Sequence, residues 1–220
     1  MLFRSLEGEP SAKITLRTRP RYADWVSLGD DRSREPPEQS RISVLAAPGT
    51  YTVTLVVDSQ DVGTQQLEIR KDPHSEGTLA DIQAQTAMGK DIRKDMDTAA
   101  EMINQIEWVR RQTYDLKAVL KDQRADEEIL AAADSLDDKL IAVEETLLQL
   151  KVTGTGQDNV RWPQAIVGKL AYLADAVATA DFPPADQHRE VHQLLKRRLE
   201  DTKQAFDGVM ETALPAFNRM

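Results

Sequence analysis

The sequence predicts an α+β protein of two parts, a small β-sandwich followed by an antiparallel four-helix bundle whose first helix is long. Two observations predict this fold class. Residues 42–69 contain short runs in which apolar and polar side chains alternate, as in half-buried strands. Nearly everything after Asp72 instead repeats apolar residues at helical spacing. We therefore expect a β-sandwich module over residues 6–73 and a helical bundle over residues 74–220.

The strongest β pattern is "AAPGTYTVTLVVD", residues 46–58. Pro48-Gly49 predicts a turn, because proline presets φ and glycine accepts positive φ. A polar turn at residues 58–61 then leads to a further strand with Leu67 and Ile69, which predicts a hairpin. Shorter strands are expected around Ile42 and over residues 12–17. About seven strands make an immunoglobulin-like sandwich, so the four or five found here predict an incomplete one. One strand face would carry Tyr51, Val53, Leu55 and Val57.

The N-terminal residues contribute little to this module. Residues 1–5, "MLFRS", resemble the translated end of a sequencing adapter, so we expect a fusion scar and a natural protein that extends further upstream. Residues 18–41 are rich in charge and proline and are expected to form a long loop. Within that loop, Trp25, Val26 and Leu28 are expected to pack onto the β module.

Four helices are predicted after residue 74. The first begins near Thr78, with Asp81 in a capping-box-like start, and continues to about residue 121. The second follows "KDQRADEE", and its apolar steps of four and three residues resemble a coiled coil. The third begins at Trp162-Pro163, and the fourth runs from about Pro184 to Thr212. Short connections predict an up-and-down bundle.

Each predicted helix has an apolar seam. The first seam is Ile92, Met96, Ala99, Ile103 and Ile106; the second is Ile129, Ala133, Leu136, Leu140, Val143, Leu147 and Leu150; the third is Ile166, Leu170, Leu173 and Val177; the fourth is Val191, Leu195, Leu199, Phe206 and Val209.

Composition excludes several kinds of function. The net charge of -9 argues against nucleic acid as a partner, since phosphate binding needs clustered lysine and arginine. The chain has no cysteine, which excludes disulfides, thiolate nucleophiles and cysteine-bound zinc. No apolar run approaches the roughly 20 residues that cross a bilayer, so no membrane insertion is expected. No cofactor is expected either.

The candidate metal ligands are His188 and His192 in "HREVH". Two histidines four residues apart lie on one helix face, as in zinc proteases. The glutamate that should follow the first histidine is replaced by Arg189, and the remaining histidine, His74, is far away in the sequence. We therefore favour two partly exposed surface histidines over a metal site.

Three further motifs have simpler interpretations. "SQDVG", residues 59–63, matches the start of an Asp-box but lacks its closing Thr-Trp, so a polar hairpin turn is favoured. "TGTGQD", residues 153–158, lacks the lysine of a phosphate loop and is interpreted as a helix stop. The acid pairs Asp30-Asp31 and Glu127-Glu128 could act in glycoside hydrolysis only if two carboxylates faced each other, and solvated charge is favoured.

The order of four segments resembles a known family. "APGTYTVTLVVD…QQLEIRKDP", "LADIQAQ", "KVTGTGQDNVRWP…KLAYLADAVATAD" and "ALPAFNRM" together are similar to the C-terminal region of bacterial sortilin-like, BNR-repeat β-propeller proteins. Members are often labelled glycosyl hydrolase or exo-sialidase-like. The resemblance implies a large upstream propeller, then a β-sandwich and a helical tail, and export to the periplasm or outside the cell. It covers residues 42–220.

The resemblance carries no catalytic residue onto this chain. The function it implies is a non-catalytic structural or interaction region, which docks within the same polypeptide against the upstream propeller or recruits a protein partner through its helices. The alternative is a contribution to a sialidase-like glycoside hydrolase whose active site lies in that propeller. We expect no enzyme activity from the chain alone.

Overall fold

The computed structural model describes residues 42, 44–122, 127–150 and 162–220. Two strands, β1 (Gly49–Val57) and β2 (Gln60–Ile69), precede the helices. The predicted strand over residues 12–17, the predicted scar over residues 1–5 and the expected packing of Trp25, Val26 and Leu28 lie outside the described residues. The helices are α1 (Leu79–Asp122), α2 (Glu127–Leu147), α4 (Ile166–Ala178), α5 (Asp186–Gly208), the π-helical turn η2 (Val209–Ala213) and α6 (Leu214–Phe217).

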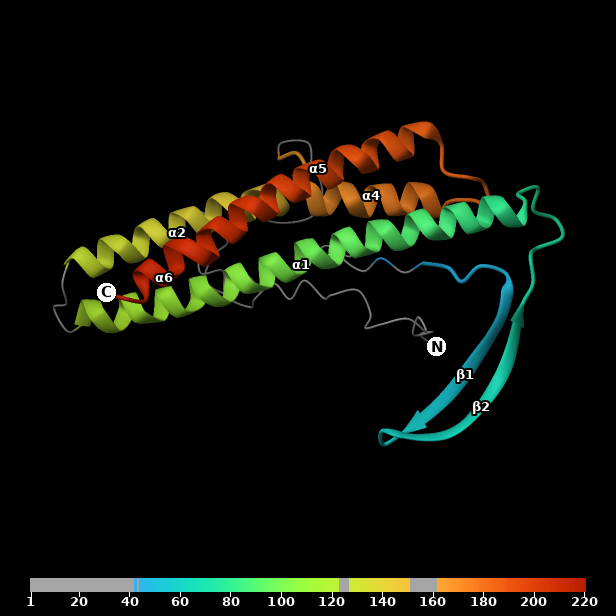
Figure 1. Cartoon of the computed structure of the whole chain (residues 1–220), viewed down its shortest axis with the longest axis horizontal. Helices are drawn as coiled ribbons and strands as arrows, with labels where there is room; N and C mark the ends of the chain where they lie inside the picture. Colours follow the sequence, from blue (N-terminus) through green and yellow to red (C-terminus); the bar gives the residue numbers. More distant parts are fainter. Residues whose placement is uncertain (1–41, 43, 123–126, 151–161) are drawn as a thin grey trace.

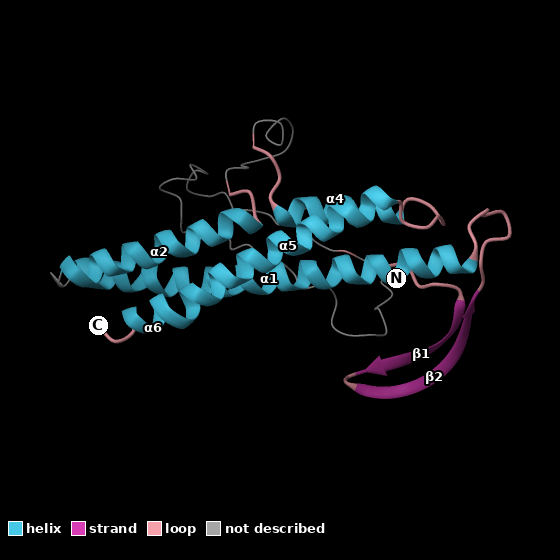
Figure 2. Ribbon diagram, turned by 45° about the horizontal axis from the view of Figure 1, so that its top comes forward, coloured by secondary structure: helices cyan, strands magenta, loops and turns pink. Residues whose placement is uncertain are grey.

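The helices form one elongated body around α1 (Figure 1). Helices α2 and α4 follow one another along α1 in the same direction, and α5 with η2 and α6 returns along both of them (Figures 1 and 2). Helix α1 contacts α2, α4 and α5, while α2 and α4 touch each other only slightly. The expected up-and-down four-helix bundle is therefore wrong, since the chain does not reverse between α2 and α4.

Helix lengths explain this arrangement. At 1.5 Å per residue, the 44 residues of α1 extend about 66 Å, whereas the 21 of α2 and the 13 of α4 extend about 32 and 20 Å. Neither short helix can cover the apolar face of α1 alone. Placed end to end, they cover most of it, and the break between them leaves the chain direction unchanged.

A single hydrophobic core runs between the helices. The predicted seams of α1 and α4 are buried throughout, and that of α2 is buried from Ala133 onward, so these predictions are confirmed. The predicted seam of α5 is wrong at its first position: Val191 is exposed, and the next residue, His192, is buried instead. The buried side chains of α5 are His192, Leu195, Leu199, Thr202 and Phe206.

The start of α1 is fixed by the predicted cap. The backbone N–H of Thr78 donates to Asp81 Oδ2 at 2.8 Å, and the backbone N–H of Asp81 donates to Thr78 Oγ1 at 3.2 Å. The pKa of Asp81 is lowered because its carboxylate accepts hydrogen bonds from the backbone N–H of Thr78 and from Thr78 Oγ1, the latter at 2.7 Å. One turn later, the amide of Gln85 donates to the carbonyls of Val177 and Ala180 at 2.6 and 2.5 Å. The N-terminal end of α1 is thereby joined to the C-terminal end of α4.

The β region is a hairpin and not a sandwich. Among the described residues the sheet has two strands, β1 paired antiparallel with β2, so the predicted immunoglobulin-like sandwich is wrong. The predicted hairpin itself is confirmed. Asp58 and Ser59 form its turn with φ of 48° and 64°, the left-handed values of a two-residue turn that matches strand twist. The hairpin projects away from the helices (Figure 1).

The chain just before β1 belongs to the helical core. Ile42 is buried in the same apolar cluster as the helices, and Val44 packs against that cluster. Val44 lies so close to Gly89 of α1 that a Cβ added there would come within 3.2 Å of Val44 Cγ1. This close approach explains a glycine inside a long helix. Residues 42 and 44 were predicted as strand positions of the β module, and the structure places them against α1 instead.

Candidate functional site

A cluster of charged side chains is buried between α1 and α2. Arg110 and Thr113 continue the apolar seam of α1 at the same steps of four and three residues, so the helix carries them into the interior. Arg110 is 1% exposed and Glu144 of α2 is fully buried. Glu107, one turn before Arg110, is also buried. Charged groups rarely enter a core unless they are paired, which makes this cluster the strongest candidate site.

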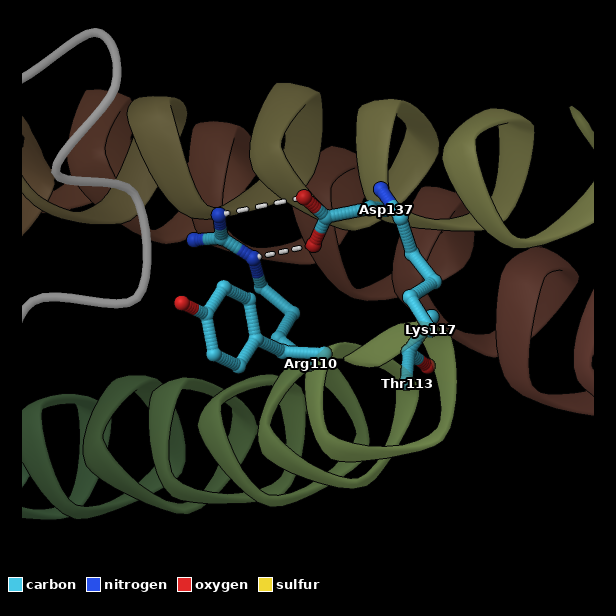
Figure 3. Close-up of a pocket in the computed structure, with 5 residues that line it drawn as sticks. Arg110, Thr113, Lys117 and Asp137 are labelled. Atoms are coloured by element: carbon cyan, nitrogen blue, oxygen red, sulfur yellow. Dashed lines mark hydrogen bonds and ion pairs between the residues drawn. The ribbon is translucent and has the colours of Figure 1, made fainter. Parts of the chain in front are cut away.

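The guanidinium group of Arg110 joins two carboxylates of α2. Its Nε donates to Asp137 Oδ1 at 2.6 Å, and its Nη1 donates to Glu144 Oε2 at 2.8 Å. Nη2 reaches Asp137 Oδ2 at 3.5 Å, so the contact with Asp137 is two-pronged. Figure 3 shows Arg110 facing Asp137 across the space between the two helices. Asp137 and Glu144 are seven residues apart and lie on one face of α2.

Glu144 is the group most perturbed by this environment. Its pKa is raised to about 8, mainly by burial and next by the nearby charge of Glu107, while Arg110 opposes the rise. Glu144 Oε1 is buried without a hydrogen-bond partner. A proton on Glu144 would give this carboxyl a donor to share with Glu107 and would reduce the excess negative charge around a single arginine. The raised pKa therefore favours the protonated form of Glu144 as the pH falls below about 8.

A small pocket opens beside Arg110. It is lined by Arg110, Thr113, Tyr114, Lys117 and Asp137, and its volume is about 20 Å³. Lys117 pairs with Asp134 of α2, so both cations at the pocket are already engaged by carboxylates. A water molecule needs about 10–15 Å³ by the same measure, so the pocket has room for about one water molecule. The site is an ion-pair network between α1 and α2.

A second buried polar pair joins α1 and α5. His192 Nε2 lies 2.7 Å from Asp95 Oδ2, and both side chains are mostly buried. His192 takes the place of an apolar residue at the first step of the α5 seam. The expectation of an exposed surface histidine is therefore wrong for His192. His192 lies three residues before Leu195 and seven before Leu199, and this spacing could have indicated that it lies on the buried face of α5.

His188 lies one turn earlier and serves a different role. Its Nδ1 accepts a hydrogen bond of 3.3 Å from the backbone N–H of Ala185 at the start of α5. His188 and His192 thus have separate partners, a backbone amide and Asp95. Within the described residues, no group of three or more histidine or carboxylate side chains is arranged to hold a metal ion.

Replacement of His192 should therefore affect stability. We expect His192→Ala to lower the free energy of unfolding by about 1–3 kcal/mol, because the carboxylate of Asp95 loses its buried partner. His188→Ala is the matched control and should change it by less than about 0.5 kcal/mol. Urea unfolding followed by circular dichroism measures both. Equal effects of the two replacements, or one equivalent of bound zinc that is lost with His192→Ala, would contradict a structural role.

The other motifs lie apart from these two clusters. Ser59–Gly63 span the hairpin turn and the start of β2, as the turn interpretation predicts. Glu127 and Glu128 are exposed in the first turn of α2, where carboxylates suit the positive end of the helix dipole. Residues 153–158 and the pair Asp30-Asp31 lie outside the described residues. In the described part of the chain, no helix is both long and apolar enough to span a bilayer.

Comparisons with known proteins add no relative: no family model, curated protein or solved structure matches this chain. The resemblance to sortilin-like propeller proteins therefore stays a prediction. The geometry alone shows a buried ion-pair network between α1 and α2, a buried His192–Asp95 hydrogen bond between α1 and α5, and an exposed hairpin.

Proposed function

We propose that this chain is a non-catalytic interaction module that joins a β-rich domain of the same exported protein through its hairpin. The observation that carries the proposal is the exposed apolar face of β1–β2. Tyr51 pairs with Leu67, and Val53 and Leu55 follow on the same side of β1. Leu55 is 59% exposed, and Val53 and Leu67 are exposed as well. No charged side chain interrupts this face between Tyr51 and Leu55.

The hairpin is also incomplete as a structural unit. Two-stranded sheets are marginally stable in water, and more strands or a packed partner are needed for independent stability. Within the described residues each strand is paired on one side alone, so both outer edges present backbone N–H and C=O groups. Such an edge supports strand addition, in which main-chain hydrogen bonds supply affinity and side-chain pockets supply specificity.

The resemblance supplies the partner in this proposal, the β-propeller expected upstream in the same polypeptide. A chain with a helical body and a projecting hairpin suits the role of a buttress. The helices give the hairpin a rigid base at one end of α1 (Figure 2). The pocket of about 20 Å³ beside Arg110 is too small for a sugar, which favours a structural role over a substrate cleft built from this chain.

The test is binding to the propeller encoded upstream, expressed as a separate protein and titrated calorimetrically. We expect this chain to bind the propeller. We expect Leu55→Lys to weaken binding by at least about tenfold, because the variant loses the free energy that burial of the leucine side chain contributes. Thr54→Lys is the matched control, since Thr54 is the adjacent residue on the opposite face of β1. It should bind with nearly the original affinity.

Several results would overturn the proposal. Equal weakening by Leu55→Lys and Thr54→Lys would remove the apolar face from the interface. An upstream reading frame without a propeller would reject the parent protein assigned here. Hydrolysis of aryl-glycosides by the purified chain would reject its non-catalytic character.

A further inference from the structure

The two outer edges of the hairpin differ in how well they are protected. Natural edge strands are kept from pairing with other chains by charged side chains, prolines or β-bulges. Strand β2 has two of these features, the charges of Asp61 and Glu68 and a register shift in which Val62 is the additional residue. The nine residues of β1, "GTYTVTLVV", contain no charge and no proline. The side chains of β1 therefore do not prevent another strand from pairing with its outer edge.

Strand β1 is also accessible to a second chain. Among the described elements it contacts β2 and no helix. Its central residues Thr52, Val53 and Thr54 are all exposed. Both views show the hairpin projecting away from the helical body (Figures 1 and 2). A strand that pairs with β1 would therefore replace none of the contacts that β1 makes in the described part of the chain.

The sequence of β1 is complementary to itself in the antiparallel direction. Val53 is the middle residue of the strand, so full overlap of two copies places Val53 opposite Val53 of the second copy. Thr52 then lies opposite Thr54, and Tyr51 lies opposite Leu55. Residues that are directly opposite point to the same face, so threonines meet threonines and apolar side chains meet apolar side chains. Pairs of both kinds stabilise antiparallel strands.

The same pairing does not suit β2. Full overlap of two β2 strands would place Asp61 opposite Glu68 of the second copy, and like charges directly opposite each other destabilise a sheet. Pairing through β1 instead leaves β2 at both outer edges of a four-stranded sheet, where its charges protect against further addition. It also supplies the additional strands that a lone hairpin needs for stability in water.

From these observations we infer that two copies of this chain associate through the outer edges of their β1 strands, antiparallel and with Val53 on the two-fold axis. Each contact is then made twice, as in other symmetric dimers. The apolar face of the hairpin, which the proposed function assigns to the propeller, is not used by this contact, because strand addition uses the edge. Self-association and propeller binding are therefore separate properties with separate tests.

Disulfide formation tests the register, because the chain has no native cysteine. In the full chain, Val53→Cys brings two thiols together on the two-fold axis. Val57→Cys is the matched control, since Val53 and Val57 are 44% and 49% exposed on the same strand. Because residue 57 lies opposite residue 49, the two copies of residue 57 would be about 27 Å apart along the strands. Under mild oxidation we expect at least about tenfold more disulfide-linked dimer with Val53→Cys.

Charged variants test the edge itself. Thr52→Lys with Thr54→Lys places lysines opposite lysines in the dimer and leaves the apolar face unchanged, so we expect the dissociation constant measured by sedimentation equilibrium to rise by at least about tenfold. Mixing this variant with Thr52→Glu, Thr54→Glu should restore the dimer, since opposite charges then face each other. Thr64→Lys with Gln66→Lys is the matched control. Thr64 and Gln66 pair with Thr54 and Thr52 from β2, away from the two-fold axis, so this control should associate like the original chain.

Several results would overturn the inference. A single monomeric species at about 1 mM would show that β1 does not pair with a second copy. Equal disulfide yields at residues 53 and 57 would reject the register. Equal effects of the β1 and β2 lysine variants would place the contact on another surface, and a lysine–glutamate mixture that stays monomeric would reject strand pairing. Failure of the propeller titration would change none of these results, so the two proposals fail separately.

Discussion

Between pH 5 and pH 9 the protein should lose stability as the pH rises. Glu144 has a folded pKa of about 8, above its ordinary value of 4.5, because it is buried beside Glu107. The folded state therefore binds a proton that the unfolded state releases. The stabilisation from that proton is fully present below about 4.5 and is lost as the pH passes through about 8. Since one pKa unit corresponds to about 1.4 kcal/mol, we expect a loss larger than that.

Urea unfolding at successive pH values measures this profile. Glu144→Gln should flatten it, because glutamine keeps the shape of the protonated carboxyl and does not ionise. The variant should also be more stable than the original protein at pH 9. Glu145→Gln is the matched control, since Glu145 is the exposed neighbour on α2. A flat profile in the original protein, or a sloping one after Glu144→Gln, would contradict the assignment of Glu144.

Replacement of the buried Arg110 should lower the stability of the protein far more than replacement of its exposed neighbour Arg111. Arg110→Met leaves Asp137 and Glu144 without their shared cation, and loss of one partner from a buried ion pair costs about 3–5 kcal/mol. Arg111→Met is the matched control. Arg111 pairs with Asp115 at 2.6 Å on the surface, and exposed pairs contribute about 0–1 kcal/mol.

A rescue experiment separates charge from packing. Adding Glu144→Gln to Arg110→Met should recover part of the lost stability, because one uncompensated buried charge is removed. Thermal unfolding of the four proteins in this cycle provides the coupling energy at pH 9, which is above the pKa of about 8 that Glu144 has beside Arg110. Equal destabilisation by Arg110→Met and Arg111→Met, or a double variant no more stable than Arg110→Met, would show that Arg110 contributes through packing alone.

Local structure was largely predictable from the sequence because it depends on neighbouring residues. The spacing of Ile92, Met96, Ala99 and Ile103 placed the buried face of α1, and Thr78 with Asp81 marked its start. The hairpin followed from the alternation around Tyr51 and a polar turn. Each of these features rests on contacts within a few residues of the chain, where pattern and structure are directly linked.

The arrangement of the helices was not predictable in the same way. A glycine-rich break ends α2, but its composition does not say whether the chain then reverses or continues. The comparison of helix lengths would have favoured continuation, because α1 is far longer than α2 or α4. Likewise, four or five strand-like runs do not establish a sandwich, and Ile42 and Val44 show that an alternating pair can pack against a helix.

The candidate site was missed because its members look like ordinary surface charges. Arg110 occupies a seam position of α1, and an arginine in an apolar seam is a usable signal. The raised pKa of Glu144 depends on its burial and on the charge of Glu107 from another helix, and no local sequence pattern contains either. For His192, the zinc-like spacing with His188 drew attention to the wrong partner, since Asp95 lies 97 positions away in the sequence.

The burial of Ile42 changes where this protein can be divided. Composition places a boundary near residue 74, between strand-like and helical sequence. A chain cut there would keep every helix and still lose Ile42 and Val44, whose side chains fill space beside α1. The hairpin is therefore an insertion in the sequence between two segments that pack in the same hydrophobic core. Anyone dissecting the molecule should keep residues 42–78 with the helices, as one cooperative unit.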